Sequence, residues 1–216
     1  MRIWMLHFVV ALALACGCGQ QTAAGEGGAP ESGQSAASPQ QQPPNLEGKA
    51  IAMIIGRRNF RDEELLKPKS IFEKAGAKVI VASSSLDPAT GMLGATVKPD
   101  VLLKDLKPTE YDAVVFVGGT GAKEYWNNRT AHKAARQTFE DGRVVAAICI
   151  APVILANAGL LDGRKATVWA SEAGRLRAQG AEYTGRDVEV DGRIITANGP
   201  EAAEDFGRTI AAALAG

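Results

Sequence analysis

Residues 143–155 read RVVAAICIAPVIL, and this stretch decides the fold. Residues 144–148 form a continuous apolar run, as expected of a strand that is buried on both faces of a parallel sheet. A helix is predicted to follow over residues 151–158, so only a short turn separates the two elements. Such a sharp strand-to-helix turn presents its central side chain at the carboxyl edge of the sheet. The sequence therefore places Cys149 where ligands bind in open α/β sheets.

Cys149 can be interpreted in two ways. A helix N-terminus supplies partial positive charge and free N–H groups, which favour a thiolate and would make Cys149 a nucleophile. The alternative is a small apolar side chain that fills the core, since free cysteine is among the most buried residue types. The other two cysteines, Cys16 and Cys18, precede the predicted folded region. Cys149 therefore has no disulfide partner within that region.

Apolar runs alternate with amphipathic stretches from Lys49 onward, which indicates βαβ units and a mainly parallel sheet. Asp62 is predicted to cap the first helix, and Pro68 to kink or restart it. The dipeptide Asp191-Gly192 predicts a hairpin between two short strands, and residues 91–103 could hold another hairpin. The predicted strands cover residues 50–55, 78–82, 113–117, 144–148, 188–190 and 194–196, and the predicted helices cover residues 62–75, 130–141, 151–158, 172–179 and 200–214.

Four segments resemble the ThiJ/PfpI family, the first three of them in the family's order and spacing and the last as its final strand and helix. They are RNFRDEELLKP at residues 58–68, VVFVGG at 114–119, AAICIAP at 146–152 and TANGPEAAEDFG at 196–207. The resemblance spans residues 49–215. It implies a flavodoxin-like three-layer α/β sandwich with a mainly parallel central sheet, similar to class I glutamine amidotransferases. It also implies a homodimer or a higher homo-oligomer.

The resemblance assigns a role to several positions of this chain. The family nucleophile falls on Cys149, and the glutamate that contacts it falls on Glu64, with Glu63 a weaker candidate. The backbone N–H groups on the oxyanion side fall on Gly119 and Ile150, where two donors would stabilise charge on a carbonyl oxygen. Like charges raise one another's proton affinity, so a protonated Glu64 that donates to sulfur is the consistent arrangement. The alternative for Glu64 is an exposed acid in the first turn of a helix.

The chain departs from the family at its histidines. Many relatives carry a histidine directly after the cysteine or about twenty residues beyond it, where this chain has Ile150 and Trp169. Trp is a donor only and cannot act as a base. His132 lies in a predicted helix remote from the matching motifs. A Cys-His dyad and proteolysis are therefore disfavoured, while Ser171 and Glu172 could supply polar function just beyond Trp169.

The N-terminal residues predict export. Arg2 precedes thirteen residues without formal charge, a run too short to span a bilayer and typical of a signal peptide. The segment LALAC ends at Cys16 and resembles a bacterial lipobox, with Cys18 as the alternative lipidation site. A low-complexity tether is predicted over residues 17–48 and the folded domain over 49–216. The expected location is the cell envelope, by a lipid anchor; the alternative is a soluble exported protein.

Composition excludes several classes of function. The 24 basic and 24 acidic residues give a formal net charge of zero, unlike the basic footprint of a nucleic-acid binder. No Cys/His cluster predicts a metal site, and no cofactor is predicted. Arg57 and Arg58 could bind an anion at the end of the first strand.

We expect a cysteine-dependent enzyme that acts on small carbonyl compounds, as glyoxalase and deglycase members do. The alternatives are a redox protein that uses Cys149 oxidation and a peptidase or amidase.

Overall fold

The computed structural model describes residues 44–216. The predicted signal peptide, both candidate lipidation sites and most of the predicted tether lie outside the described residues. Within them, no helix is both long enough and apolar enough to cross a membrane. Leu46 is fully buried and its N–H donates to the Ala75 carbonyl at 2.7 Å, so the packed structure reaches back to this residue.

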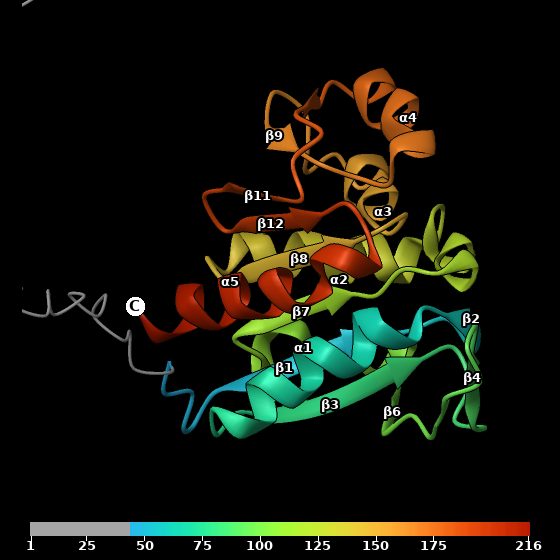
Figure 1. The fold of residues 1–216 in the computed structure, drawn as a ribbon, viewed down its shortest axis with the longest axis vertical. Coiled ribbons are helices and arrows are strands. Elements are labelled where there is room, and N and C mark those ends of the chain that lie inside the picture. The colour runs from blue at the N-terminus through green and yellow to red at the C-terminus, as the bar shows by residue number, and fades with distance from the viewer. Residues whose placement is uncertain (1–43) are drawn as a thin grey trace, which may run out of the picture. The chain divides into compact units, whose positions relative to one another are not determined.

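A seven-stranded sheet forms the centre of the fold, in the order β11-β12-β8-β7-β1-β3-β6 (Figure 1). All neighbouring pairs are parallel except β11 and β12, which form the predicted hairpin. This confirms the flavodoxin-like fold with a mainly parallel sheet. The strands are β1 (Ala50–Ile54), β3 (Lys78–Ser83), β6 (Val101–Leu102), β7 (Ala113–Phe116), β8 (Val144–Ile148), β11 (Val188–Asp191) and β12 (Ile194–Ala197).

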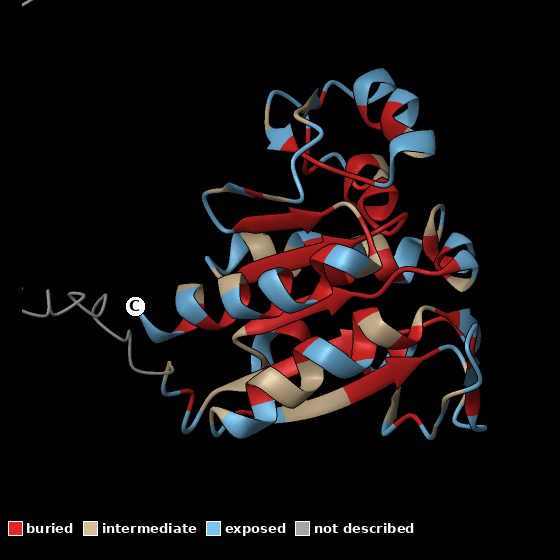
Figure 2. Ribbon diagram, viewed as in Figure 1, coloured by how far each residue is buried: buried red, intermediate tan, exposed pale blue. Residues whose placement is uncertain are grey.

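Helices cover both faces of this sheet. α1 and α5 lie side by side on one face and α2 lies on the other (Figure 1). A Cβ on Gly207 of α5 would come within 2.9 Å of the Pro68 Cα in α1, so the missing side chain permits this close approach. Figure 2 shows that β7 and β8 are buried along their whole length, and α3 is buried up to Ala156. The helices are α1 (Asp62–Lys74), α2 (Arg129–Glu140), α3 (Pro152–Asn157), α4 (Ala173–Ala178) and α5 (Ala203–Ala215), and the 3₁₀ turns are Leu103–Asp105, Pro108–Glu110, Thr120–Tyr125, Ala170–Glu172 and Pro200–Ala202.

Two details of α1 differ from the predictions. The helix runs without a break through Pro68, which is buried, so proline does not restart it. Asp62 is the first helical residue and not its cap, because the N-cap position falls on Arg61. Both carboxylate oxygens of Asp62 instead accept N–H groups of a neighbouring turn, from Leu93 and Ala95 at 2.8 Å each.

Two small sheets accompany the large one. β2 (Arg58–Phe60), β4 (Ala89–Gly91) and β5 (Thr96–Val97) form the first, and β9 (Lys165–Ala166) and β10 (Glu182–Tyr183) form the second. The predicted hairpin at residues 91–103 is therefore shorter, since β4 pairs with β5 while β6 joins the large sheet. The turn between β4 and β5 is the one that Asp62 holds.

Candidate functional site

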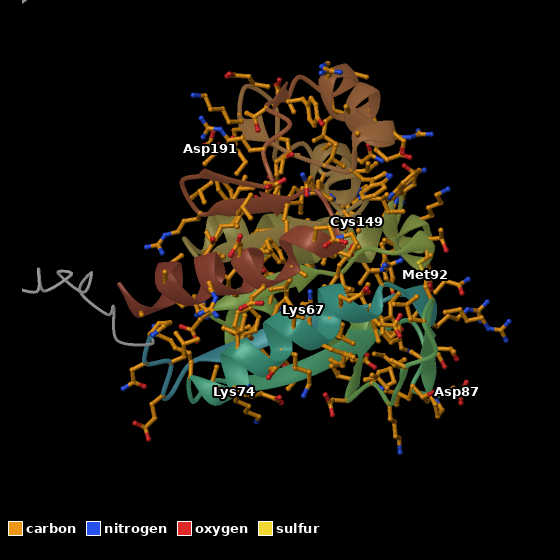
Figure 3. The ribbon with its side chains drawn as sticks, viewed as in Figure 1. Lys67, Lys74, Asp87, Met92, Cys149 and Asp191 are labelled. Atoms are coloured by element: carbon orange, nitrogen blue, oxygen red, sulfur yellow. The ribbon has the colours of Figure 1, made fainter. Side chains whose placement is uncertain are left out.

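Cys149 occupies a sharp turn between β8 and α3, at the carboxyl edge of the sheet (Figure 3). Its φ angle of 62° lies in the left-handed region, where a residue other than glycine is strained. Two backbone hydrogen bonds hold this conformation. The Cys149 N–H donates to the Ala197 carbonyl at 2.9 Å, and the Cys149 carbonyl accepts the Trp169 N–H at 2.8 Å. The structure therefore builds the strand-to-helix turn that the sequence predicts.

The end of β7 approaches Cys149 closely because two glycines follow that strand. A Cβ on Gly118 would lie 2.4 Å from the Glu64 Oε2 and 2.5 Å from the Cys149 Cβ. Gly119 has a φ angle of 84°, and its N–H lies against the Cys149 sulfur together with the N–H of Ile150. The two predicted backbone donors are thus brought together at the thiol.

Glu64 extends from the first turn of α1 to the same point and is fully buried. Its Oε2 accepts the Gly118 N–H at 3.0 Å. Among the described residues Oε1 has no hydrogen-bond partner. The carboxyl group lies close enough to the Cys149 thiol for each group to shift the other's pKa. Burial raises the pKa of Glu64 to about 8, while the Cys149 thiol, the Gly118 N–H and Arg61 oppose the shift. The carboxyl group is therefore mainly protonated at neutral pH, and the exposed alternative for Glu64 is wrong.

The ionisation of Cys149 differs from the expectation for a helix N-terminus. Burial and, after it, the neighbouring Glu64 together raise the pKa of the thiol to about 12. The N–H groups of Gly119 and Ile150 lower the pKa but do not outweigh desolvation. Cys149 is 9% exposed. The resting site thus holds two protonated acids, a thiol and a carboxyl group, which titrate as a coupled pair.

Glu63 is directed away from this pair. It forms a two-point ion pair with Arg61, with N–O distances of 2.8 and 3.1 Å. The Arg61 hydrogen bond lowers the pKa of Glu63, in opposition to burial. The hydrogen bond with Glu63 raises the pKa of Arg61, and the nearby Glu64 and Cys149 raise it further. A fixed positive charge therefore accompanies the site, and Glu64 rather than Glu63 contacts the thiol.

Trp126 supports the turn in a way that the sequence did not reveal. Its Nε1–H donates to the Ile150 carbonyl at 3.1 Å. Lys123 and Arg175 lie over its ring, at 5.5 and 4.8 Å from the centroid. No local pattern signals this contact, since its partner Ile150 is distant along the chain.

The other polar candidates lie apart from the sulfur. His132 Nε2 is 2.8 Å from the Trp126 carbonyl and so belongs to the support of that residue. Glu172 binds Ser171 and Arg175. Arg57 and Arg58 are exposed at the start of β2. Within residues 44–216, no group of three or more Cys, His, Asp or Glu side chains could hold a metal ion.

Comparison with known proteins identifies the family of the folded region. Residues 49–213 match the DJ-1/PfpI family. An uncharacterised protein of Methanocaldococcus jannaschii is 42% identical over 173 residues, which are 79% of this chain and 84% of that protein. Deglycase PfpI of Pyrococcus furiosus is 34% identical over 148 residues, 68% of this chain and 89% of the relative.

The crystal structure of a ThiJ/PfpI domain protein from Brachyspira murdochii is similar in fold. It superposes with a TM-score of 0.75 and 35% sequence identity, covering 77% of this chain and 98% of that one. The match over residues 49–213 includes all of the elements that form the Cys149 turn. The chain belongs to the DJ-1/PfpI family.

Proposed function

We propose that this protein is a cysteine-dependent enzyme that acts on small reactive carbonyl compounds. The observation that carries the proposal is the buried pairing of Glu64 with Cys149 between two backbone donors. A relative named as a deglycase is 34% identical to this chain over 148 residues. That name supports carbonyl chemistry at this site.

The geometry suits addition of the thiol to a carbonyl carbon. Glu64, in its ionised form, takes the S–H proton of Cys149 while the sulfur electron pair forms a bond to carbon. The C=O electron pair moves to oxygen, where the N–H groups of Gly119 and Ile150 stabilise the charge. Glu64 then returns the proton to that oxygen, and a hemithioacetal results. A pKa of about 8 suits this exchange, because a general base works best when its pKa is near the operating pH.

Turnover of methylglyoxal by the purified chain tests the proposal. Cys149→Ser is expected to reduce turnover to background while the far-UV circular dichroism spectrum stays unchanged, since a serine hydroxyl is a far weaker nucleophile in this site. Glu63→Gln is the matched control and is expected to keep its activity, because Glu63 does not contact the thiol. Equal turnover in Cys149→Ser would remove the proposal.

One alternative remains open to the same experiment. A redox role would use oxidation of Cys149 to a sulfinate, which a protonated Glu64 could bind through the unpaired Oε1. Wild-type protein without carbonyl turnover, but with a peroxide-sensitive Cys149, would favour it. We do not propose a peptidase, because Ile150 and Trp169 stand at the positions of the histidines. We also propose that the enzyme acts in the cell envelope, as a homo-oligomer.

A further inference from the structure

A cavity of about 320 Å³ lies beside the Cys149 turn. Two segments that line the cavity also hold the Cys149 turn through backbone hydrogen bonds. Trp169, whose N–H bonds to the Cys149 carbonyl, lines one side, while Asn198 and Gly199 line another directly after Ala197, the acceptor of the Cys149 N–H. The volume is at the lower end of the range for small-molecule sites, about 300–1,000 Å³. The size therefore suits a small ligand, or one part of a ligand, held against the segments that hold the Cys149 turn.

Two aromatic rings line this cavity. Trp169 is 47% exposed although it is a large apolar residue, and its ring rests on Gly199, where a Cβ would be 2.7 Å from the indole Cε3. Tyr183 supplies the second ring, and the guanidinium of Arg177 lies 4.7 Å from its centroid. An aromatic face attracts cations. The Tyr183 ring thus already binds one guanidinium group, that of Arg177.

The charged residues that line the cavity are all acidic. Asp187 and Glu201 are among the nine lining residues, and none of the nine is Lys or Arg. Asp187 uses Oδ1 to accept the Asn198 amide at 2.8 Å, while Glu201 is exposed. The nearest basic residue in sequence, Arg186, pairs with Glu189 at 3.7 Å. The lining therefore combines two carboxylates with the exposed Trp169 ring, while the Tyr183 ring already holds the Arg177 guanidinium.

We propose that this cavity binds an organic cation, an alkylammonium or alkylguanidinium group, beside Cys149. Aromatic faces and carboxylates together favour such a group over a neutral ligand of the same shape, because both interactions depend on its charge. If the proposed function is right, the substrates include carbonyl compounds that carry a cationic group. That second statement rests on the proposed function, whereas the binding itself does not.

Titration of the full-length Cys149→Ala chain with butylguanidinium and butylurea tests the binding. The two probes have nearly the same shape and differ in charge, and the alanine excludes reaction at sulfur. We expect butylguanidinium to bind about fivefold more tightly or better, a difference that one cation–π contact alone can supply. Equal binding of butylurea, or no saturable binding of butylguanidinium, would overturn the proposal.

Variants in the same background locate the site. Glu201→Gln and Trp169→Ala are each expected to weaken butylguanidinium binding by about fivefold. Asp205→Asn is the matched control, because Asp205 is exposed on α5 and does not line the cavity. An unchanged affinity in both cavity variants would place the cation elsewhere and contradict the proposal.

Inhibition of turnover separates this proposal from the proposed function. In the otherwise wild-type chain, butylguanidinium should inhibit methylglyoxal turnover, and Glu201→Gln should weaken that inhibition. A chain that binds the cation but shows no carbonyl turnover would contradict the proposed function and leave the cation site standing. Turnover that saturating butylguanidinium does not affect would contradict the placement of the cation beside Cys149.

Discussion

Cys149 and Glu64 are two acids that share one buried space, and burial sets the protonation of both. Desolvation raises the pKa of each group because it penalises the charged form. The N–H groups of Gly119 and Ile150 act in the opposite direction on Cys149 but are weaker. The resting thiol is therefore kept neutral, and chemistry begins only when Glu64 gives up its proton.

The protonation of Glu64 predicts a dependence of stability on pH. Its pKa is about 8 in the folded protein against 4.5 for an ordinary glutamate, so between these values the folded state holds more protons than the unfolded state. The contribution of Glu64 to the free energy of unfolding is therefore fully present below about pH 4.5 and is lost as the pH rises to about 8. Glu64→Gln removes this titrating group. As the pH rises from about 4.5 to 8, the free energy of unfolding of the variant should therefore increase relative to that of wild type, by up to about 1.4 kcal/mol per pH unit.

Urea unfolding of both proteins at several pH values measures this difference. Glu63→Gln serves as the control, since Arg61 lowers the pKa of Glu63 and no such gain is expected. A difference between Glu64→Gln and wild type that stays constant from pH 4.5 to 8 would mean that Glu64 is not held protonated.

At the scale of single elements, α1 depends on a contact that its own sequence does not reveal. Asp62 lies in the first turn of the helix, where an acid commonly interacts with the positive end of the helix dipole. Both its oxygens instead accept hydrogen bonds from the turn between β4 and β5. This turn adjoins the β2 segment that leads into α1. The carboxylate thus fixes the start of the helix that carries Glu64.

Asp62→Ala should destabilise the fold by about 2–3 kcal/mol, because it leaves two backbone donors without their charged acceptor. The matched control is Asp205→Ala, which removes an exposed acid from the first turn of α5 and should cost less than about 1 kcal/mol. Thermal or urea unfolding compares the two. Equal losses would indicate that Asp62 acts only through the helix dipole.

Sequence patterns predict the long elements and miss the short ones. Buried runs such as β1, β7 and β8 are visible because every residue in them is apolar or small. Strands of two or three residues, such as β2, β9 and β10, carry no measurable period, and their pairing depends on distant segments. The strand before Cys149 and the helix after it are both predicted, so the sequence also predicts the turn between them.

The site was predictable only in part for a similar reason. Cys149 follows from the local pattern, while Glu64, Gly119 and Ile150 follow from the family resemblance. The hydrogen bond of Trp126 and the ionisation of Cys149 depend on how segments pack, which no local pattern contains. Trp169 stands where relatives have a histidine, and its place in a cavity wall follows from the folded chain.

At the scale of the whole molecule, the packed domain follows an N-terminal segment that predicts lipidation. In a bacterial host, the full chain should fractionate with membranes, and Cys16→Ser should release it to the soluble fraction. Acyl chains contribute about 0.8 kcal/mol per buried methylene, so their loss removes the anchor. Cys18→Ser is the control and should leave the chain on the membrane. Release by Cys18→Ser alone would favour the alternative site, and release by neither would contradict a lipid anchor.

The most direct test of the Cys149–Glu64 pairing measures an equilibrium and a rate in one variant. In Glu64→Gln, the pKa of the Cys149 thiol, read from the pH dependence of the thiolate absorbance, should be lower than in wild type, because the carboxylate that raises the thiol pKa is gone. Methylglyoxal turnover should nevertheless fall about a hundredfold or more, because the base that takes the S–H proton is gone as well. An unchanged thiol pKa, or turnover that does not fall, would contradict the account.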